Sequence, residues 1–201
     1  RELELMHKCA EAKRLPHPNR ELYLGTTKIV MRTIPMLIEE TWTLFRKSFP
    51  SLHDLPMQEQ LELYRFYLPN HATIDSILRA WKVWGTFFEF SMCSVTLCFD
   101  LKSPDSWFEP GEGGINRAAL VSTMALYVSD QKLLIGPCLN KAQLKDQEIN
   151  ALFAMILCET DIRTHVSDRL LSSLDAIRNE ALTELQRFYR DEMKLTDYSA
   201  R

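Results

Sequence analysis

This chain contains little glycine and has no excess of positive charge. Only 6 of its 201 residues are glycine, while Leu, Glu, Lys, Arg and Met are plentiful, a composition that favours helices. The 24 Lys and Arg are outnumbered by 27 Asp and Glu, so no overall positive field would attract DNA or RNA. No apolar run approaches the ~20 residues that span a bilayer, and the charged start of the chain is unlike a signal peptide. We therefore expect that this segment binds neither nucleic acid nor a membrane.

The chain also lacks a cysteine pattern that binds zinc. Its cysteines are odd in number and scattered, and most have apolar neighbours, which predicts buried free thiols in a reducing compartment. Cys93 and Cys98 are the one close pair, and no second pair or nearby histidine completes a metal site. The five are Cys9, Cys93, Cys98, Cys138 and Cys158.

Catalytic motifs are missing as well. The Gly-rich stretch 110–114 is not followed by Lys-Ser or Lys-Thr and does not connect a strand to a helix, so it is predicted to be a loop rather than a phosphate cradle. The five histidines are far apart, and none pairs with Glu at metal-site spacing. We expect neither an enzyme nor a bound cofactor.

What the chain does have is apolar residues at steps of three and four, the spacing of amphipathic helices. Proline should kink one of these helices at Pro35 and interrupt or kink another at Pro69. The one β-like run is 94–99, and 134–137 is expected to be irregular. The expected helices cover residues 2–13, 21 or 26 to 49, 56–90, 115–129, 142–158 and 165–193. Together they predict a single all-α domain with a small β element.

The most informative stretch is 45–64. One helix is expected to end near Phe49, a turn containing Pro50 follows, and a second helix starts near Pro56. A lysine, Lys47, lies at the end of the first helix, and an apolar face begins the second. Such an arrangement can build a shallow groove with one positive end, which suits the short helix of another protein.

This stretch resembles the signature of nuclear hormone receptor ligand-binding domains, and its spacing matches without a gap. Arg46 stands where the family prefers a small residue, Glu59 where Asp is usual, and Tyr64 where an aliphatic residue or Phe is usual. The order of the later elements agrees too, and the loose match is similar to diverged, nematode-type members. The signature positions that match are Phe45, Lys47, Leu52, Leu55, Glu59, Gln60 and Leu63.

The resemblance implies a three-layer antiparallel helical sandwich with a short β-turn element. Residues 1–20 would be a linker and first helix region, and 21–201 a ligand-binding domain that lacks its last helices. Those helices would carry a homodimer or heterodimer interface and the acidic half of a charge clamp. Such a domain binds a small lipophilic ligand and coactivator or corepressor helices in the nucleus, and reaches DNA only through a separate zinc-bearing module.

The resemblance also implies a coregulator groove. Lys47 would be one half of the charge clamp, capping the last carbonyls of an incoming Leu-x-x-Leu-Leu helix, where a cation is worth ~0.3–1 kcal/mol. Considered alone, Lys47 would instead be a solvated lysine that stabilises its own helix end. The groove residues implied are Thr43, Lys47, Met57, Leu61 and Arg65.

A ligand pocket and a salt bridge are implied in the same way. Arg79 lies among apolar neighbours and needs a partner if buried. The sequence leaves two partners open, the polar or carboxylate end of a ligand and a carboxylate within the domain. Glu148 and Arg201 occupy the positions of a structural salt bridge. The pocket residues implied are Met31, Ile34, Ile38, Ala72, Ser76 and Arg79.

Two rival functions remain open at this point. The first is a ligand-independent interaction module whose pocket is filled by its own aromatic side chains. The second is a lipid-carrying helical domain unrelated to transcription. The aromatic residues that could fill the pocket are Trp81, Trp84, Phe87, Phe88 and Phe90.

Overall fold

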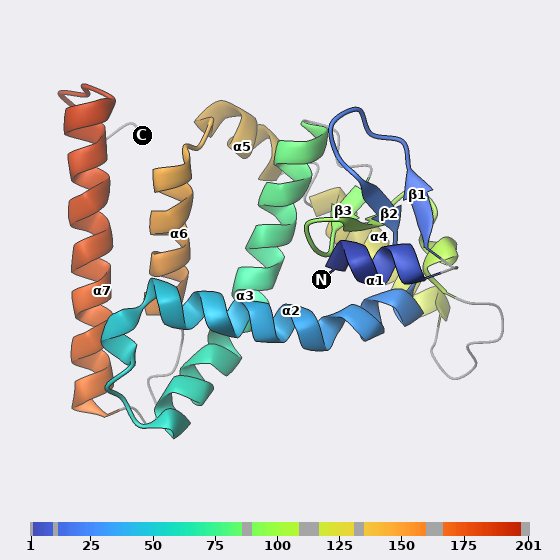
Figure 1. Cartoon of the computed structure of the whole chain (residues 1–201). Helices are drawn as coiled ribbons and strands as arrows, with labels where there is room; N and C mark the ends of the chain where they lie inside the picture. Colours follow the sequence, from blue (N-terminus) through green and yellow to red (C-terminus); the bar gives the residue numbers. More distant parts are fainter. Residues whose placement is uncertain are drawn as a thin grey trace. The chain divides into compact units, whose positions relative to one another are not determined.

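The computed structural model describes residues 2–9, 12–85, 90–108, 117–130, 135–159 and 167–197. The chain divides into two compact units (Figure 1). The first unit comprises residues 1–38 and 74–141, and the second comprises residues 39–73 and 142–201. Two long helices, α2 (Thr27–Ser48) and α3 (Met57–Trp84), contribute to both units. Within the described residues, no helix combines the length and the apolar character that crossing a membrane requires.

The first unit is built around a small sheet. Its strands lie in the order β1-β2-β4-β3, with β2 parallel to β4 and the other two pairs antiparallel. Buried Met6, Tyr23, Ile29 and Leu97 pack together beside the sheet. The elements of this unit, besides parts of α2 and α3, are α1 (Glu2–Lys8), β1 (Lys13–Leu15), β2 (Leu22–Leu24), β3 (Phe90–Met92), β4 (Leu97–Asp100), the 3-10 turn η2 (Pro104–Trp107), α4 (Arg117–Asp130) and α5 (Gly136–Ala142).

This sheet is larger than the sequence predicted. The expected helix 2–13 ends at Lys8, and a strand begins at Lys13. Strand β2 is held by hydrogen bonds to β4, from Tyr23 N to Thr96 O at 2.8 Å and from Gly25 N to Cys98 O at 2.7 Å. A Cβ atom at Gly25 would lie 3.3 Å from the Leu97 side chain, so glycine suits this close approach. A three-residue strand whose partner lies far along the chain has too weak a local pattern to be predicted.

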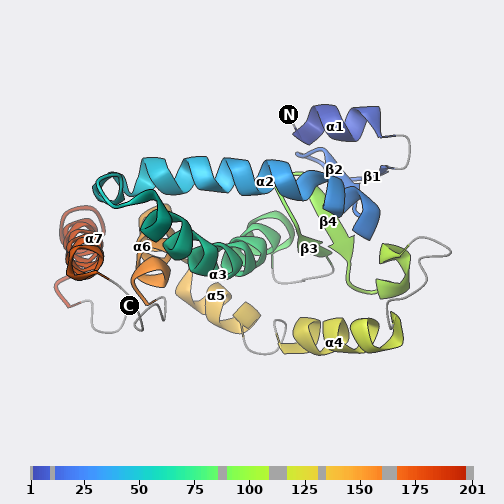
Figure 2. The same cartoon turned by 90° about the horizontal axis from the view of Figure 1, so that it is seen from below.

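The second unit is helical and surrounds an aromatic and aliphatic core. Its elements are the C-terminal part of α2, the 3-10 turn η1 (Pro50–Leu52), the N-terminal part of α3, α6 (Asp146–Cys158), α7 (Asp168–Arg187) and the π-helical turn η4 (Phe188–Glu192). Figures 1 and 2 both show α6 and α7 side by side. The core consists of Phe45, Phe49, Leu52, Leu55, Leu63, Tyr64, Tyr67, Ala154, Leu157, Cys158, Leu170, Leu174 and Ile177.

The long helices agree with the prediction, and most differences lie at their ends. Helix α3 runs through Pro69, as α2 does through Pro35, so of the interruption or kink expected at Pro69 the interruption does not occur. Helix α5 starts at Gly136, where an irregular segment was expected. Helix α6 starts at Asp146 rather than residue 142, because Gln143 takes a left-handed conformation with φ of 49° that no helix continues through.

Candidate functional site

The signature segment lies at the centre of the second unit's core. Phe45 is only 2% exposed. Its ring centroid lies 5.5 Å from that of Trp42, 5.4 Å from Tyr64, 5.5 Å from Tyr67 and 5.7 Å from Phe49. Offset and edge-to-face ring contacts of this kind each stabilise by about 0.5–1.5 kcal/mol beyond area burial. These five side chains, which we name the aromatic cluster, hold the end of α2 against the start of α3.

Gln60 of the signature closes the turn between the two helices. It is buried, and its side-chain Nε2 donates to Leu55 O at 2.9 Å and to His53 O at 3.3 Å. The His53 ring in turn hydrogen-bonds through Nε2 to Arg46 O, 2.7 Å away. Buried backbone carbonyls require such partners, so this glutamine fixes the course of the chain from Arg46 to Gln60. The motif match alone did not reveal that role.

Glu59, the acidic signature residue, reaches the start of α7. The Ser167 hydroxyl donates to Glu59 Oε2 at 2.7 Å and accepts from Leu170 N at 3.1 Å, as the N-cap of α7. One serine therefore connects the first turn of α3 to the first turn of α7. A contact between residues 108 positions apart leaves no local signal in the sequence.

The residues predicted for a coregulator groove lie on two exposed ridges. Thr43 and Lys47 are one helical turn apart on α2 and both are exposed. Met57, Leu61 and Arg65 recur every four residues on α3, and the two apolar side chains are 53% and 47% exposed. Neither the Lys47 ammonium nor the Arg65 guanidinium hydrogen-bonds or ion-pairs with a described residue. The structure thus brings this set to the surface of one compact unit.

Two departures from the signature are accommodated by packing. Arg46 lies over the Trp42 ring, with its Cζ 5.9 Å from the centroid, a cation–π contact that a small residue could not make. Tyr64 is buried in the aromatic cluster, and this burial raises its pKa to about 12, although a hydrogen bond with Thr41 opposes the shift. Its phenol therefore stays neutral and acts as a core group.

Comparison with known families identifies the chain. A family model described as the ligand-binding domain of nuclear hormone receptor matches residues 18–201. The chain belongs to this family. No curated protein and no solved structure gives a significant match. The predicted helical fold of nuclear receptor ligand-binding domains is confirmed, and the family is one of regulatory, ligand-binding domains.

The ligand residues expected for a nuclear receptor domain fall on both units, and the structure describes each by itself. Arg79 is half-buried, and its Nε donates to Asp75 Oδ2 at 2.5 Å, one turn earlier in α3. A carboxylate of the domain is thus one partner of this arginine, while its two terminal nitrogens bond to no described residue. The Ser76 hydroxyl hydrogen-bonds with Ser91 of β3 at 3.1 Å.

The other expected ligand residues differ in exposure. Met31 is 67% exposed and Ile38 42%, while Ile34, between them on α2, is half-buried. These three side chains lie at helical spacing on one face of the part of α2 that belongs to the first unit. Ala72 belongs to the second unit and is exposed. Their role toward a ligand stays a prediction.

Glu148 of the expected salt bridge is buried at 7% exposure. Its carboxylate accepts from Lys145 N at 2.7 Å and from the Tyr189 hydroxyl at 3.0 Å. It therefore caps the start of α6 and ties this helix to η4. Arg201, the partner that the family resemblance implies, lies outside the described residues.

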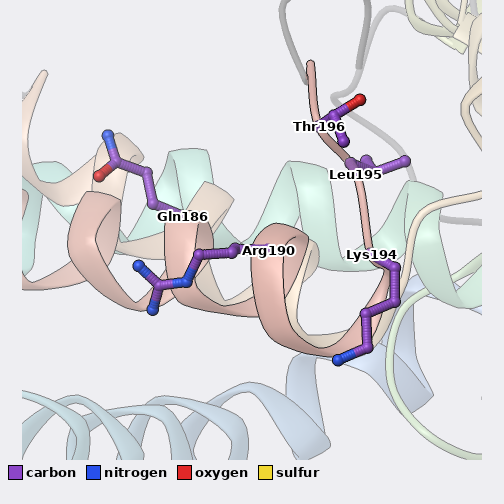
Figure 3. Close-up of a pocket in the computed structure, with 5 residues that line it drawn as sticks. All are labelled: Gln186, Arg190, Lys194, Leu195 and Thr196. Carbon is purple, nitrogen blue, oxygen red and sulfur yellow. The ribbon is translucent and has the colours of Figure 1, made fainter.

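A hollow of about 480 Å³ lies at the end of α7 (Figure 3). Arg190, one of its two basic residues, is paired with Asp191 through Nε–Oδ1 and Nη2–Oδ2 distances of 2.7 and 3.0 Å. This pairing lowers the pKa of Asp191. The hollow contains none of the residues predicted for ligand or coregulator binding; its lining is Gln186, Arg190, Lys194, Leu195 and Thr196.

Metal-binding and thiol chemistry have little structural basis in the described residues. These contain no group of three His, Cys, Asp or Glu side chains that could hold a metal ion. The five cysteines are free, with Cys98 and Cys158 buried and Cys138 exposed. Burial raises the pKa of the Cys98 thiol to about 12, with a further contribution from Asp100. Such a thiol stays protonated and unreactive near neutral pH.

Proposed function

We propose that this domain regulates transcription in the nucleus by docking a short amphipathic coregulator helix on the second unit, in response to a small lipophilic ligand. The observation that supports the proposal is the pair of exposed ridges on α2 and α3. They combine apolar side chains with two cations that have no partner among the described residues. Both ridges are held by the buried aromatic cluster, so the surface is largely formed before a partner arrives.

The chemistry of the ridges fits a helix with leucines on one face. Met57 and Leu61 would be covered by those leucines, with about 25 cal/mol gained per Å² of apolar surface removed from water. The last carbonyls of the incoming helix have no partner within that helix and carry the negative end of its dipole. Lys47, in the last turn of α2, supplies a cation for them.

Charge reversal at Lys47 tests this docking mode. The Lys47→Glu variant should bind a fluorescent Leu-x-x-Leu-Leu peptide about tenfold more weakly, because a favourable contact with the peptide's carbonyl end becomes a repulsive one. Fluorescence polarisation measures the affinity. Arg169→Glu makes the same charge change on exposed Arg169 of α7 and should leave the affinity unchanged. Equal losses in both variants would mean that net charge alone governs binding.

For the ligand, the proposal assigns Arg79 to an acidic or polar end group. Its terminal nitrogens bond to no described residue, so they are available to a carboxylate. The Arg79→Leu variant should lose about tenfold in affinity for a fluorescent long-chain fatty acid, a loss typical of one charge-assisted hydrogen bond.

Asp75→Asn is the matched control for Arg79. It removes the charge of the arginine's partner within the helix but keeps the guanidinium, so fatty-acid affinity should be retained or improved. If the two variants lose affinity equally, the pair is structural and the ligand role of Arg79 is wrong.

A self-filled, ligand-independent module is the second candidate, favoured by aromatic packing in the first unit. The ring centroid of Trp84 lies 4.8 Å from that of Phe90 and 5.2 Å from that of His17. Trp81 Nε1 donates to Asn140 Oδ1 at 3.0 Å, and Phe87 and Phe88 lie outside the described residues. Native mass spectrometry separates the candidates, since a co-purified lipid supports the ligand-responsive function and an empty protein the self-filled module.

A further inference from the structure

A segment upstream of the family match is built into the first unit. The match begins at residue 18, yet α1 and β1 precede it, and Figures 1 and 2 both show α1 beside β2. Met6 of α1 is 2% exposed and packs with Tyr23, Ile29 and Leu97. Strand β1 adds to the sheet, pairing Lys13 with Leu24. We name residues 2–9 and 12–17 the strap.

A single carboxylate joins the start of the strap to the turn between β3 and β4. Oε1 of Glu2 accepts from the hydroxyls of Ser94 and Thr96, and from Thr96 N at 3.3 Å. Ser94 and Thr96 are 4% and 7% exposed, so the bonds are largely shielded from water. Ser94 Oγ also accepts from Leu97 N at 3.0 Å, which holds the turn in the shape that receives the carboxylate. Charge-assisted bonds in such surroundings are the strong ones.

Further along, the strap has two weaker attachments. The His7 ring hydrogen-bonds through Nε2 to Glu21 Oε1, 2.8 Å away, and the Tyr23 hydroxyl donates to the same oxygen at 2.5 Å. The His17 ring meets the edge of Trp84 at the end of α3. His7 and His17 are not buried, and these contacts are partly hydrated, so they contribute less than the Glu2 contact.

We propose that α1 and β1, within residues 2–9 and 12–17, form a releasable strap on the first unit, locked by the Glu2 carboxylate on the Ser94–Thr96 turn. Helix α1 has 7 residues and is too short to persist without its anchors. Loss of the lock therefore frees α1 and uncovers the apolar site that Met6 fills. By linkage, anything that rearranges the turn changes how firmly the strap is held, and pulling on the strap alters the turn.

The labelling rate of the Cys93 thiol reports whether the strap is bound or released. Cys93 lies in the turn, its backbone N donates to Leu97 O at 2.8 Å, and its side chain packs against the same core as Met6. The Cys93 side chain is half-buried, and burial, with Cys98 and Glu2 adding to the effect, raises the pKa of its thiol, so the closed strap keeps the thiol neutral and partly shielded. Two other thiols serve as references, Cys138 as an exposed one and Cys158 as a buried one of the second unit.

Thiol labelling of the full chain with N-ethylmaleimide, followed by mass spectrometry, tests the lock. In Glu2→Ala, Cys93 should label about tenfold faster relative to Cys138, while Cys158 stays protected. Glu4→Ala is the matched control, because Glu4 is an exposed residue of the same helix whose one ion-pair partner among the described residues is Lys8, at 2.6 Å. It should label at the parent rate.

A second variant keeps the test decisive. Thr96→Val removes one hydroxyl donor with little change of shape and should accelerate Cys93 labelling severalfold. Combined with Glu2→Ala it should add little, since both act on one contact. Full additivity in the double variant, a Cys93 rate in Glu2→Ala equal to that in Glu4→Ala, or parallel labelling of Cys158 would each overturn the proposal.

Discussion

Replacing Phe45 by alanine is expected to lower the free energy of unfolding by about 3–5 kcal/mol, the range for a fully buried phenylalanine. The side chain is 2% exposed and contacts four aromatic rings, so truncation leaves a cavity and removes ring contacts together. The cluster around it spans α2 and α3 within the second unit. Little relaxation is expected there, because rigid rings from two helices cannot collapse into the space.

Urea unfolding followed by circular dichroism measures this loss. The neighbouring residue offers the control, since Leu44 is 53% exposed and Leu44→Ala should change stability by no more than about 0.5 kcal/mol. A conservative Phe45→Leu variant should fall between the two. Similar midpoints for Phe45→Ala and Leu44→Ala would show that the aromatic cluster is not what holds the ridges in place.

The second large effect is expected at Glu148. In the Glu148→Ala variant the free energy of unfolding should fall by about 2–3 kcal/mol. The reason is that Lys145 N and the Tyr189 hydroxyl lose a charged, buried hydrogen-bond acceptor. The start of α6 would also lose a favourable negative charge. Glu148→Gln, which keeps an oxygen acceptor, should lose less.

The same urea experiment tests Glu148, with Glu180→Ala as the comparison. Glu180 is an exposed residue of α7 in the same unit, and its removal should have almost no effect. Tyr189→Phe should show part of the Glu148→Ala loss. If it shows none, the hydroxyl contact at 3.0 Å adds nothing to stability, and the loss in Glu148→Ala comes from the other contacts of Glu148, the helix cap among them.

For the proposed function, these stability effects distinguish residues that support the docking surface from residues that contact the peptide. Phe45 is buried beneath the surface on which Lys47 lies, so its loss should weaken peptide binding only together with stability. Lys47→Glu should weaken binding with little loss of stability, because the lysine is exposed and has no described partner. That contrast distinguishes a docking residue from a structural one.

Much of the helical part could be predicted from the chain alone. The stretch that became α2 was expected to end at 49 and ends at Ser48, and the α7 stretch, expected over 165–193, is helical from Asp168 through the π turn. Both have strong three- and four-residue periodicity, which depends only on neighbours along the chain. No interruption occurs at Pro69, because tertiary packing maintains a helix that local propensity opposes.

The candidate site, like the fold, could be predicted from the sequence only in part. The signature from Phe45 to Leu63 identified the family, since its spacing is a local property of two helices and one turn. What Gln60 and Glu59 do was not visible, because their partners are backbone carbonyls of a folded turn and a serine 108 residues away. Exposure of Met57 and Leu61 likewise depends on which helices cover α3.

The amino-acid sequence by itself determined the helices and the family, since each follows from spacing within some twenty neighbouring residues. Tertiary structure alone decided the four-stranded sheet and the strap. Strand β2 forms where β4 offers hydrogen bonds, β1 forms where β2 does, and Glu2 meets Thr96 across 94 positions. Long-range pairing depends on the whole fold, so no local pattern records it.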